Sequence, residues 1–320
     1  MTNTRLRCTI SAVGLLILIA LCGSGTAATR LEWKLGKGKT YYQRTVIDQI
    51  TQTMMGQEQK MEQAIGTGLK LQVLDVDAQG NMRIQYTFLW MRLKQDNPMG
   101  QVDYDSSRQS PVPGGAEGFA ALVGQSYTVK LTPQGKVLDV NGVEQLRQAV
   151  LKKLPAGEDP AQTMNPVAMY IDKAKVQQMV ESNMAIYPDK PVNPGDSWSR
   201  ERTIVMGFTM IIQSKWTLQK GEAGVATIGV AATLRSDPNG PPMDVGGMKL
   251  KGDLAGTQEG TIQVAEATGL VTATKGRQQL KGEIKAITTP DQPPMMVIPT
   301  VIDAQITGEM SEQMWKTAPQ

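Results

Sequence analysis

The 320-residue sequence contains no histidine and only two cysteines, Cys8 and Cys22. Without histidine the chain cannot build a Ser-His-Asp or Cys-His nucleophile, a histidine-ligated zinc or copper site, or a histidine pH switch. Aromatic residues are also scarce, at 5% of the chain, with only three phenylalanines. These absences exclude most common catalytic and soft-metal machinery and leave surfaces and cavities as the places where function is expected.

Residues 1–28 have the pattern of a secretory signal peptide. Arg5 and Arg7 precede an uncharged apolar run over residues 10–21, and small residues follow at 23–28. The apolar run is nearer a dozen residues than the roughly 20 that a membrane-spanning helix needs. We therefore predict cleavage at the end of this segment and export to the periplasm or the extracellular space.

A lipid anchor at Cys22 is the alternative fate of this segment. Bacterial lipoprotein signals normally carry a small residue just before the cysteine, whereas this chain has the bulky Leu21. The simpler interpretation is that Cys22 is one apolar residue of the signal. Loss of residues 1–28 removes both cysteines and two arginines, so no disulfide forms and the formal net charge falls from +3 to +1. Such a nearly neutral chain predicts no nucleic-acid partner, and a membrane contact only if Cys22 is lipidated.

Alternating apolar and polar residues predict β-strands. Residues 69–74 and 82–88 alternate on either side of Asp77-Ala78-Gln79-Gly80, which predicts a hairpin with a tight turn. The acidic turn superficially resembles a calcium loop that starts at Asp75. An EF-hand would need a bidentate acid where Tyr86 stands and helices on both sides, so we favour the turn.

A second hairpin and two helices complete the first half of the pattern. Residues 127–131 and 136–138 flank a turn with Pro133 at its second position. Apolar residues with helical spacing then cover 143–154 and about 172–184. Helical periodicity is confined to this middle part of the sequence.

After the helices, the strand pattern resumes and repeats the first half in order. Three pairs of segments match: 38–41 with 195–198, 80–84 with 224–228, and 128–131 with 261–264. Matches in one order indicate an internal duplication, although β hairpins also resemble one another without one. The sequence predicts a mainly β fold of two tandem antiparallel curved-sheet units, at residues 29–140 and 188–320. A short helical insert at residues 141–187 lies between them.

Five motifs in this order resemble a known family. They are Leu31-Glu32-Trp33-Lys34, Met55-Gly56-Gln57, Asp75-Val76-Asp77-Ala78-Gln79-Gly80, Thr132-Pro133-Gln134-Gly135-Lys136-Val137 and Pro194-Gly195-Asp196-Ser197-Trp198. The chain is similar to secreted bacterial proteins known only as a domain of unknown function, over most of residues 30–280. The resemblance implies a secreted, β-rich envelope protein and transfers no catalytic residue.

Methionine is abundant, with 19 in the chain, and Met206/Met210 and Met310/Met314 are each spaced four residues apart. Thioethers favour Cu(I), but such sites commonly add histidine, which is missing. Methionine can instead fill irregular parts of a phenylalanine-poor core, or line an adaptable groove for an apolar ligand. We treat these four methionines as candidate groove residues and predict no metal or cofactor.

For hydrolysis without histidine, the remaining options are paired carboxylates, a Ser-Lys pair or lysine Schiff-base chemistry. No Ser-x-x-Lys occurs after residue 28. The acid pairs Asp103/Asp105 and Glu58/Glu62 are explained more simply as solvated charges. The sequence therefore predicts a non-catalytic envelope protein that binds an apolar ligand or lipid in a sheet concavity. Two alternatives stay open: a hydrolase that uses only carboxylates, and an envelope scaffold whose sheet edges pair with another protein.

Overall fold

The computed structural model describes residues 28–97, 100–108, 111–154, 167–245, 248–288 and 293–315. Within these ranges, thirteen strands form one antiparallel sheet. The strands are β1 (Thr40–Met55), β2 (Gln57–Val76), β3 (Met82–Asn97), β4 (Gly100–Asp105), β5 (Ser126–Leu131), β6 (Val137–Asn141), β7 (Ser197–Met206), β8 (Phe208–Glu222), β9 (Val225–Ser236), β10 (Met243–Val245), β11 (Met248–Ala265), β12 (Leu270–Ile287) and β13 (Met296–Ser311). The helices are α1 (Glu117–Leu122), α2 (Val143–Lys153), α4 (Ala168–Ile171) and α5 (Lys173–Met184).

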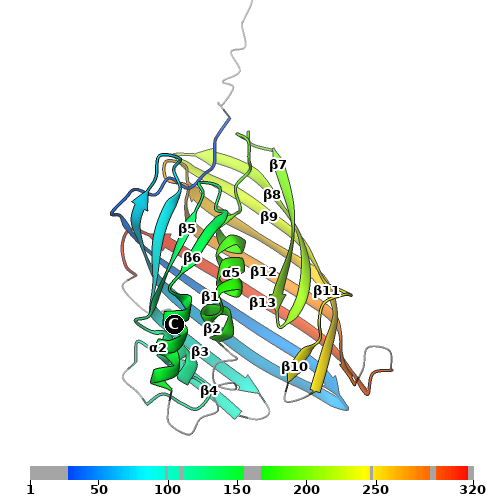
Figure 1. Ribbon diagram of the computed structural model, residues 1–320. Coiled ribbons are helices and arrows are strands. Elements are labelled where there is room, and N and C mark those ends of the chain that lie inside the picture. Colours follow the sequence, from blue (N-terminus) through cyan, green and yellow to red (C-terminus); the bar gives the residue numbers. More distant parts are fainter. Residues whose placement is uncertain are drawn as a thin grey trace, which may run out of the picture.

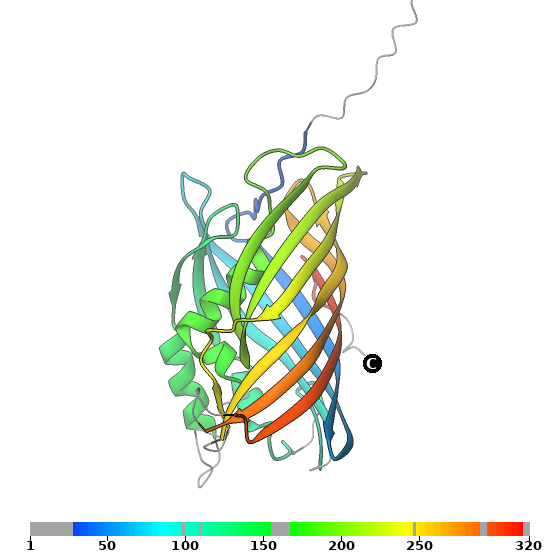
Figure 2. The same ribbon diagram turned by 90° about the vertical axis from the view of Figure 1, so that its right-hand side faces the viewer.

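The strands lie in the order β6-β5-β3-β2-β1-β13-β12-β11-β9-β8-β7, and β4 and β10 pair at the side with β3 and β11. β1 and β13 are the central neighbours that join the two halves, from Tyr42 opposite Ser311 to Thr53 opposite Thr300. The sheet is strongly curved, and α2 and α5 lie on its concave side between β5–β6 and β7–β9 (Figures 1 and 2). The outer edges of the sheet are therefore β6 and β7, the two strands that flank the helical segment.

This architecture confirms the predicted mainly β fold with helices between two sets of strands. The two predicted units, 29–140 and 188–320, contribute to one continuous sheet. Within it, β1-β2-β3-β5-β6 form one series in which each strand pairs with the next, and β7-β8-β9-β11-β12 form a second such series. The domain boundaries and the internal duplication stay predictions.

The β2–β3 connection is the tight turn that the sequence predicts. Asp77 Oδ1 accepts hydrogen bonds from the backbone N–H groups of Gln79 and Asn81, at 3.1 and 2.9 Å. Gly80 has φ +79°, a left-handed conformation that glycine adopts without strain. Because strands flank this turn on both sides, the residues form a hairpin and lack the helices of an EF-hand.

The two predicted helices are present as α2 and α5, and the expectation of helices only in the middle of the chain is wrong. α1 lies earlier, between β4 and β5, and buries Phe119 and Leu122. Its six residues are too few to show helical periodicity in the sequence. Prolines and glycine in residues 155–160 predict a loop after α2, and this segment lies outside the described residues.

The main hydrophobic core fills one end of the curved sheet and continues under the helices. The segment before β1 closes that end, where Leu31, Trp33 and Leu35 are buried. Trp33 donates from its backbone N–H to the carbonyl of Pro133 and from Nε1 to the carbonyl of Met184, at 2.7 and 2.8 Å. A smaller cluster around β8, β9, β11 and β12 forms a second core.

Candidate functional site: the interior cavity

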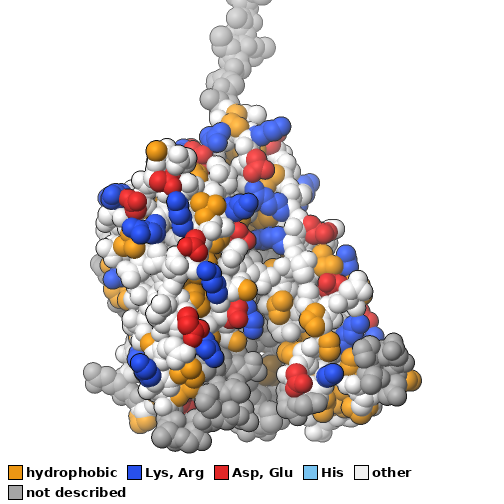
Figure 3. Space-filling view, viewed as in Figure 1, with side chains coloured by type: hydrophobic (Ala, Val, Ile, Leu, Met, Phe, Trp, Pro, Cys, Tyr) orange, Lys and Arg blue, Asp and Glu red, His pale blue; other side chains and the backbone are white. Residues whose placement is uncertain are grey.

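The concave face of the sheet and the helices α4 and α5 enclose a cavity of about 350 Å³. This volume lies in the range of small-molecule sites. Aliphatic and aromatic side chains from both halves of the sheet contribute to the lining, among them Ile47, Ile65, Leu69, Tyr86, Phe88, Tyr127, Ile204, Ile212 and Ile306. Figure 3 shows the helix-bearing face, which is hollowed below the helices and carries hydrophobic side chains in the recess.

Helix α5 covers the cavity by bridging the two outer edges of the sheet. On the β6 side, Glu181 Oε1 accepts a hydrogen bond of 2.9 Å from the backbone N–H of Val137. On the β7 side, Gln178 Nε2 donates to the carbonyl of Thr203 at 2.8 Å. The helix thus uses side chains to satisfy strand-edge groups that a neighbouring strand would otherwise pair.

The sequence of α5 explains its position over the cavity. Asp172 caps the helix, with Oδ1 accepting from the N–H of Lys175 at 3.0 Å. Val176, Val180 and Met184 recur at four-residue spacing and are buried. The capped end and this apolar stripe fix the helix against the concave face of the sheet.

One wall of the cavity is a cluster of aromatic rings. Tyr86 and Tyr127 stack with ring centroids 5.3 Å apart, and Phe88 meets Tyr170 edge-on at 5.5 Å. Tyr170 Oη shares a hydrogen bond of 3.3 Å with Thr67. Within the described part of the chain, the buried hydroxyls of Tyr86 and Tyr127 have no hydrogen-bond partner. Burial raises the pKa of both phenols, so these hydroxyls stay protonated and can donate.

The wall formed by β7 carries a cation. Arg202 lines the cavity, with its guanidinium 5.8 Å from the ring centroid of Trp216. Its Nη1 donates to the carbonyl of Ser182 at 3.0 Å, while its buried Nε has no partner among the described residues. Burial and then the charge of Arg200 lower the pKa of Arg202, but an arginine stays charged at neutral pH.

Charge in the cavity is of one sign. Among the described residues, the lining contains two cationic side chains, the half-buried Arg202 and the exposed Lys175, and no aspartate or glutamate. Among the described acids, Asp105 is buried, and its Oδ1 accepts from Trp90 Nε1 and Ser107 Oγ outside the cavity. The arrangement can accommodate an apolar molecule and offer hydrogen-bond donors to acceptor atoms on it.

None of the three candidate methionines with described side chains lines this cavity. Met210 belongs to the smaller core cluster, Met310 to the main core, and Met314 is exposed. The side chain of Met206 lies outside the described ones, as does the whole of Cys22. A groove role for these methionines stays a prediction, while the methionines in the lining are Met169, Met179 and Met184.

Sequence reasoning missed Arg202 and the paired tyrosines. A signal was present in β7, where Trp198, Arg200, Arg202 and Ile204 alternate with more exposed residues. Such a pattern places two arginines on the inward face of a strand. Tyr86 was recognised only as part of a strand, because the sequence alone does not show which inward positions border empty space.

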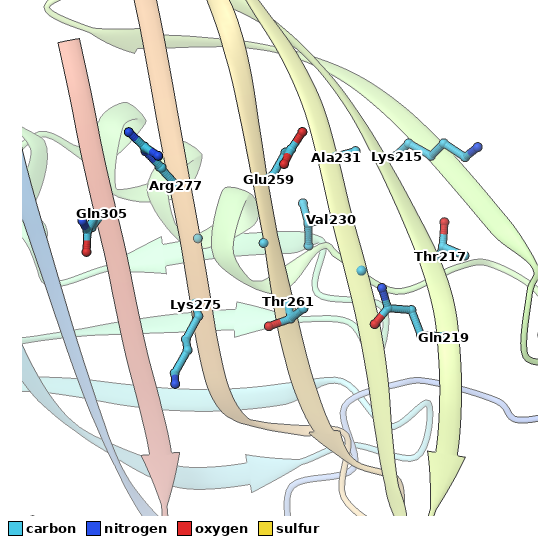
Figure 4. Close-up of a pocket in the computed structure, with 13 residues that line it drawn as sticks. Lys215, Thr217, Gln219, Val230, Ala231, Glu259, Thr261, Lys275, Arg277 and Gln305 are labelled. Atoms are coloured by element: carbon cyan, nitrogen blue, oxygen red, sulfur yellow. The ribbon is translucent and has the colours of Figure 1, made fainter.

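A second hollow lies on the outer, convex face of the sheet, over strands β8 to β13. Its floor includes the backbone of Gly229, Gly260 and Gly276, and polar side chains such as Lys215 and Glu259 surround it. In Figure 4 the helices lie behind the strands that carry these side chains. This hollow is wide and open, so it offers a ligand far less enclosure than the interior cavity.

Two features are absent from the residues that the structure describes. These residues contain no group of three or more aspartate, glutamate or cysteine side chains arranged to hold a metal ion. Within the same ranges, no helix has the length and apolar character needed to cross a membrane.

The chain belongs to a family of unknown function (DUF6263), whose model matches residues 79–271. This confirms the resemblance to a domain of unknown function. A comparison with curated proteins finds no match.

Among solved structures, the chain is similar to one described as lipid–protein interactions in lipovitellin, at 11% identity and a TM-score of 0.46. That match covers 89% of this chain and 26% of the other, so this chain spans about a quarter of its length. It is also similar to DynF from the dynemicin biosynthesis pathway of Micromonospora chersina (9% identity, TM-score 0.21, covering 88% and 85%). A third is OccK7 (OpdD) of Pseudomonas aeruginosa (8%, 0.21, covering 86% and 99%). At these TM-scores the likenesses carry no conclusion about function.

Proposed function

We propose that this protein binds an apolar ligand, such as a lipid, in the interior cavity between the concave sheet and helices α4 and α5. The observation that carries the proposal is a space beneath the helices lined mostly by apolar side chains, which are aliphatic, aromatic or methionine. Well-packed interiors leave few voids larger than a water molecule. A cavity of about 350 Å³ beneath a helix therefore suits an occupant.

The proposed setting is outside the cytoplasm. The basic, apolar and small-residue segments of 1–28 support export through a signal peptide. A carrier for an apolar molecule has an evident use there, because such molecules cross aqueous space poorly without an enclosing protein.

The hydrolase alternative has less support from this cavity. It would need two buried acids about 5 to 9 Å apart, and the lining has none. The scaffold alternative would need free sheet edges, whereas α5 occupies part of both outer edges through Val137 and Thr203. We therefore favour ligand binding over both.

Filling the cavity tests the proposal. Ile306 on β13 faces the cavity opposite Ile47 on β1, so Ile306→Trp should occupy ligand space. The matched control is Gln305→Trp, the preceding residue on the same strand, whose side chain is exposed on the outer face. We expect the wild type and Gln305→Trp to bind the neutral dye Nile red with enhanced fluorescence, and Ile306→Trp to lose most of that signal.

Circular dichroism would verify that both variants fold. Organic extraction and mass spectrometry of protein from its native envelope should find a lipid with the wild type and the control variant, and deplete it from Ile306→Trp. Equal dye binding by folded Ile306→Trp and Gln305→Trp would contradict binding in this cavity.

A further inference from the structure

We infer that the ligand of the interior cavity is an amphiphile with an anionic head, and that Arg202 on β7 binds this head while the apolar chain lies along the aliphatic and aromatic walls. The inference rests on the proposed function and specifies the ligand class. Three features of the cavity support it: an uncompensated charge, unused donors, and an apolar remainder.

The first feature is the charge. Arg202 is half-buried, and the cavity lining provides no carboxylate to pair with it. Glu181 favours the charged form from a distance, but its Oε1 is bonded to the backbone N–H of Val137. A cation that is partly withdrawn from water without an ion-pair partner is costly. An anion placed in the cavity against the guanidinium of Arg202 would relieve that cost through a charge-assisted contact.

The second feature is the set of unused donors. Arg202 is held in place by the Ser182 carbonyl and the Trp216 ring, so its guanidinium is oriented before any ligand arrives. Tyr86 and Tyr127 are only 3% and 2% exposed, and their hydroxyls have no hydrogen-bond partner in the described ranges. Buried polar groups in proteins are almost always paired. All three groups are donors without an acceptor, but each atom is buried, so an acceptor on the ligand reaches them only when neighbouring side chains move.

The third feature is the rest of the lining. Between Arg202 and the tyrosines, the sheet presents Ile47, Ile65 and Ile306 among its inward side chains. These side chains contact hydrocarbon, and the uncharged polar side chains of the lining, such as Gln43, Thr45 and Gln278, carry no charge that would compete with Arg202 for the head. A carboxylate or phosphate head with an alkyl chain matches the charge of Arg202 and the apolar walls together.

The test compares competitors that share one chain and differ in the head. Protein freed of lipid and carrying Nile red is titrated with palmitate, hexadecyl phosphate and methyl palmitate, each below the concentration at which it forms micelles. We expect at least one anionic amphiphile to displace the dye at a concentration about tenfold or more below that of methyl palmitate, as for a hydrogen bond to a charged group. The better of the two anions distinguishes a carboxylate from a phosphate source.

Two substitutions locate the head. Arg202→Gln should bring the anions and the ester within about twofold, and Arg202→Lys, which keeps the charge, should retain part of the preference. The matched control Lys175→Gln removes the other, exposed cation of the lining and should leave the preference unchanged. Circular dichroism and Nile red binding report whether each variant folds and keeps its cavity.

The outcomes separate the two proposals. Equal displacement by palmitate, hexadecyl phosphate and methyl palmitate would overturn the anionic head but keep an apolar ligand. A preference that survives in folded Arg202→Gln and disappears in Lys175→Gln would overturn the role of Arg202. Failure of all three competitors to displace the dye would overturn the ligand class, while the comparison of Ile306→Trp with Gln305→Trp decides the proposed function separately.

Discussion

Removing the hydroxyl of Tyr86 or Tyr127 should stabilise the ligand-free protein, which is the opposite of the usual effect of deleting a buried polar group. Each hydroxyl is buried without a partner among the described residues. Burial of an unpaired hydroxyl costs about 1–3 kcal/mol in mutational data. We therefore expect Tyr86→Phe and Tyr127→Phe each to raise the free energy of unfolding by about 1 kcal/mol.

The protein contains its own control. Tyr187 is equally buried, but its hydroxyl donates to the carbonyl of Gly269. Tyr187→Phe should therefore lower the free energy of unfolding by about 1 kcal/mol, the net worth of a typical hydrogen bond. Because the rings of Tyr86 and Tyr127 stack, the effects of the double variant need not add.

Urea unfolding of lipid-free protein, followed by circular dichroism, measures these differences as shifts of the midpoint at constant slope. In thermal unfolding, a change of 1 kcal/mol shifts the unfolding midpoint by about 2–4 °C for a protein of roughly 150–250 residues. If Tyr86→Phe and Tyr127→Phe destabilise the protein as much as Tyr187→Phe does, the two hydroxyls have partners and the donor-rich description of the cavity fails.

Two further predictions concern turns. Gly135 has φ +82°, and a Cβ there would lie 2.1 Å from the carbonyl oxygen of Met184, so Gly135→Ala should cost about 3 kcal/mol or more. The control is Gly38→Ala, where φ is +80° but the space around the residue is open; it should cost only the strain of a left-handed residue, about 1–2 kcal/mol. Equal losses of unfolding free energy for the two variants in urea would refute the clash at Gly135. Hydrogen bonding to Asn81 first, and to other donors, lowers the pKa of Asp77 to about 2. The stability difference between the wild type and Asp77→Ala should therefore be full above about pH 4 and shrink as the pH falls towards 2, and a difference that stays constant over that range would contradict it.

The local elements of the fold could be predicted because their causes are local. The turn at Asp77 to Gly80 is formed by hydrogen bonds among residues at most four apart, and its residue types are those that such turns require. The α2 and α5 helices have apolar stripes and a recognisable start, at Gly142 and Asp172. Features with such local causes can be predicted from the sequence alone.

The pairing of distant strands and the site could not be predicted in the same way. Nothing in β1 indicates that β13 is its neighbour, because alternation fixes the face of a residue and leaves the partner strand open. Inward residues such as Ile65 look alike whether they meet other side chains or empty space. Arg202 gains its significance only when α5 and Trp216 are placed around it.

The central position of β1 and β13 has a consequence for biosynthesis. Residues 56–295 lie between the two strands in the sequence, yet the strands pair over most of their length. During translation or translocation, one edge of β1 therefore stays unpaired until β13 emerges. An unpaired strand edge is a template for aggregation. Polar residues along this edge, among them Gln43, Thr45 and Gln49, limit that hazard, and the curved sheet joins its halves only as a late event.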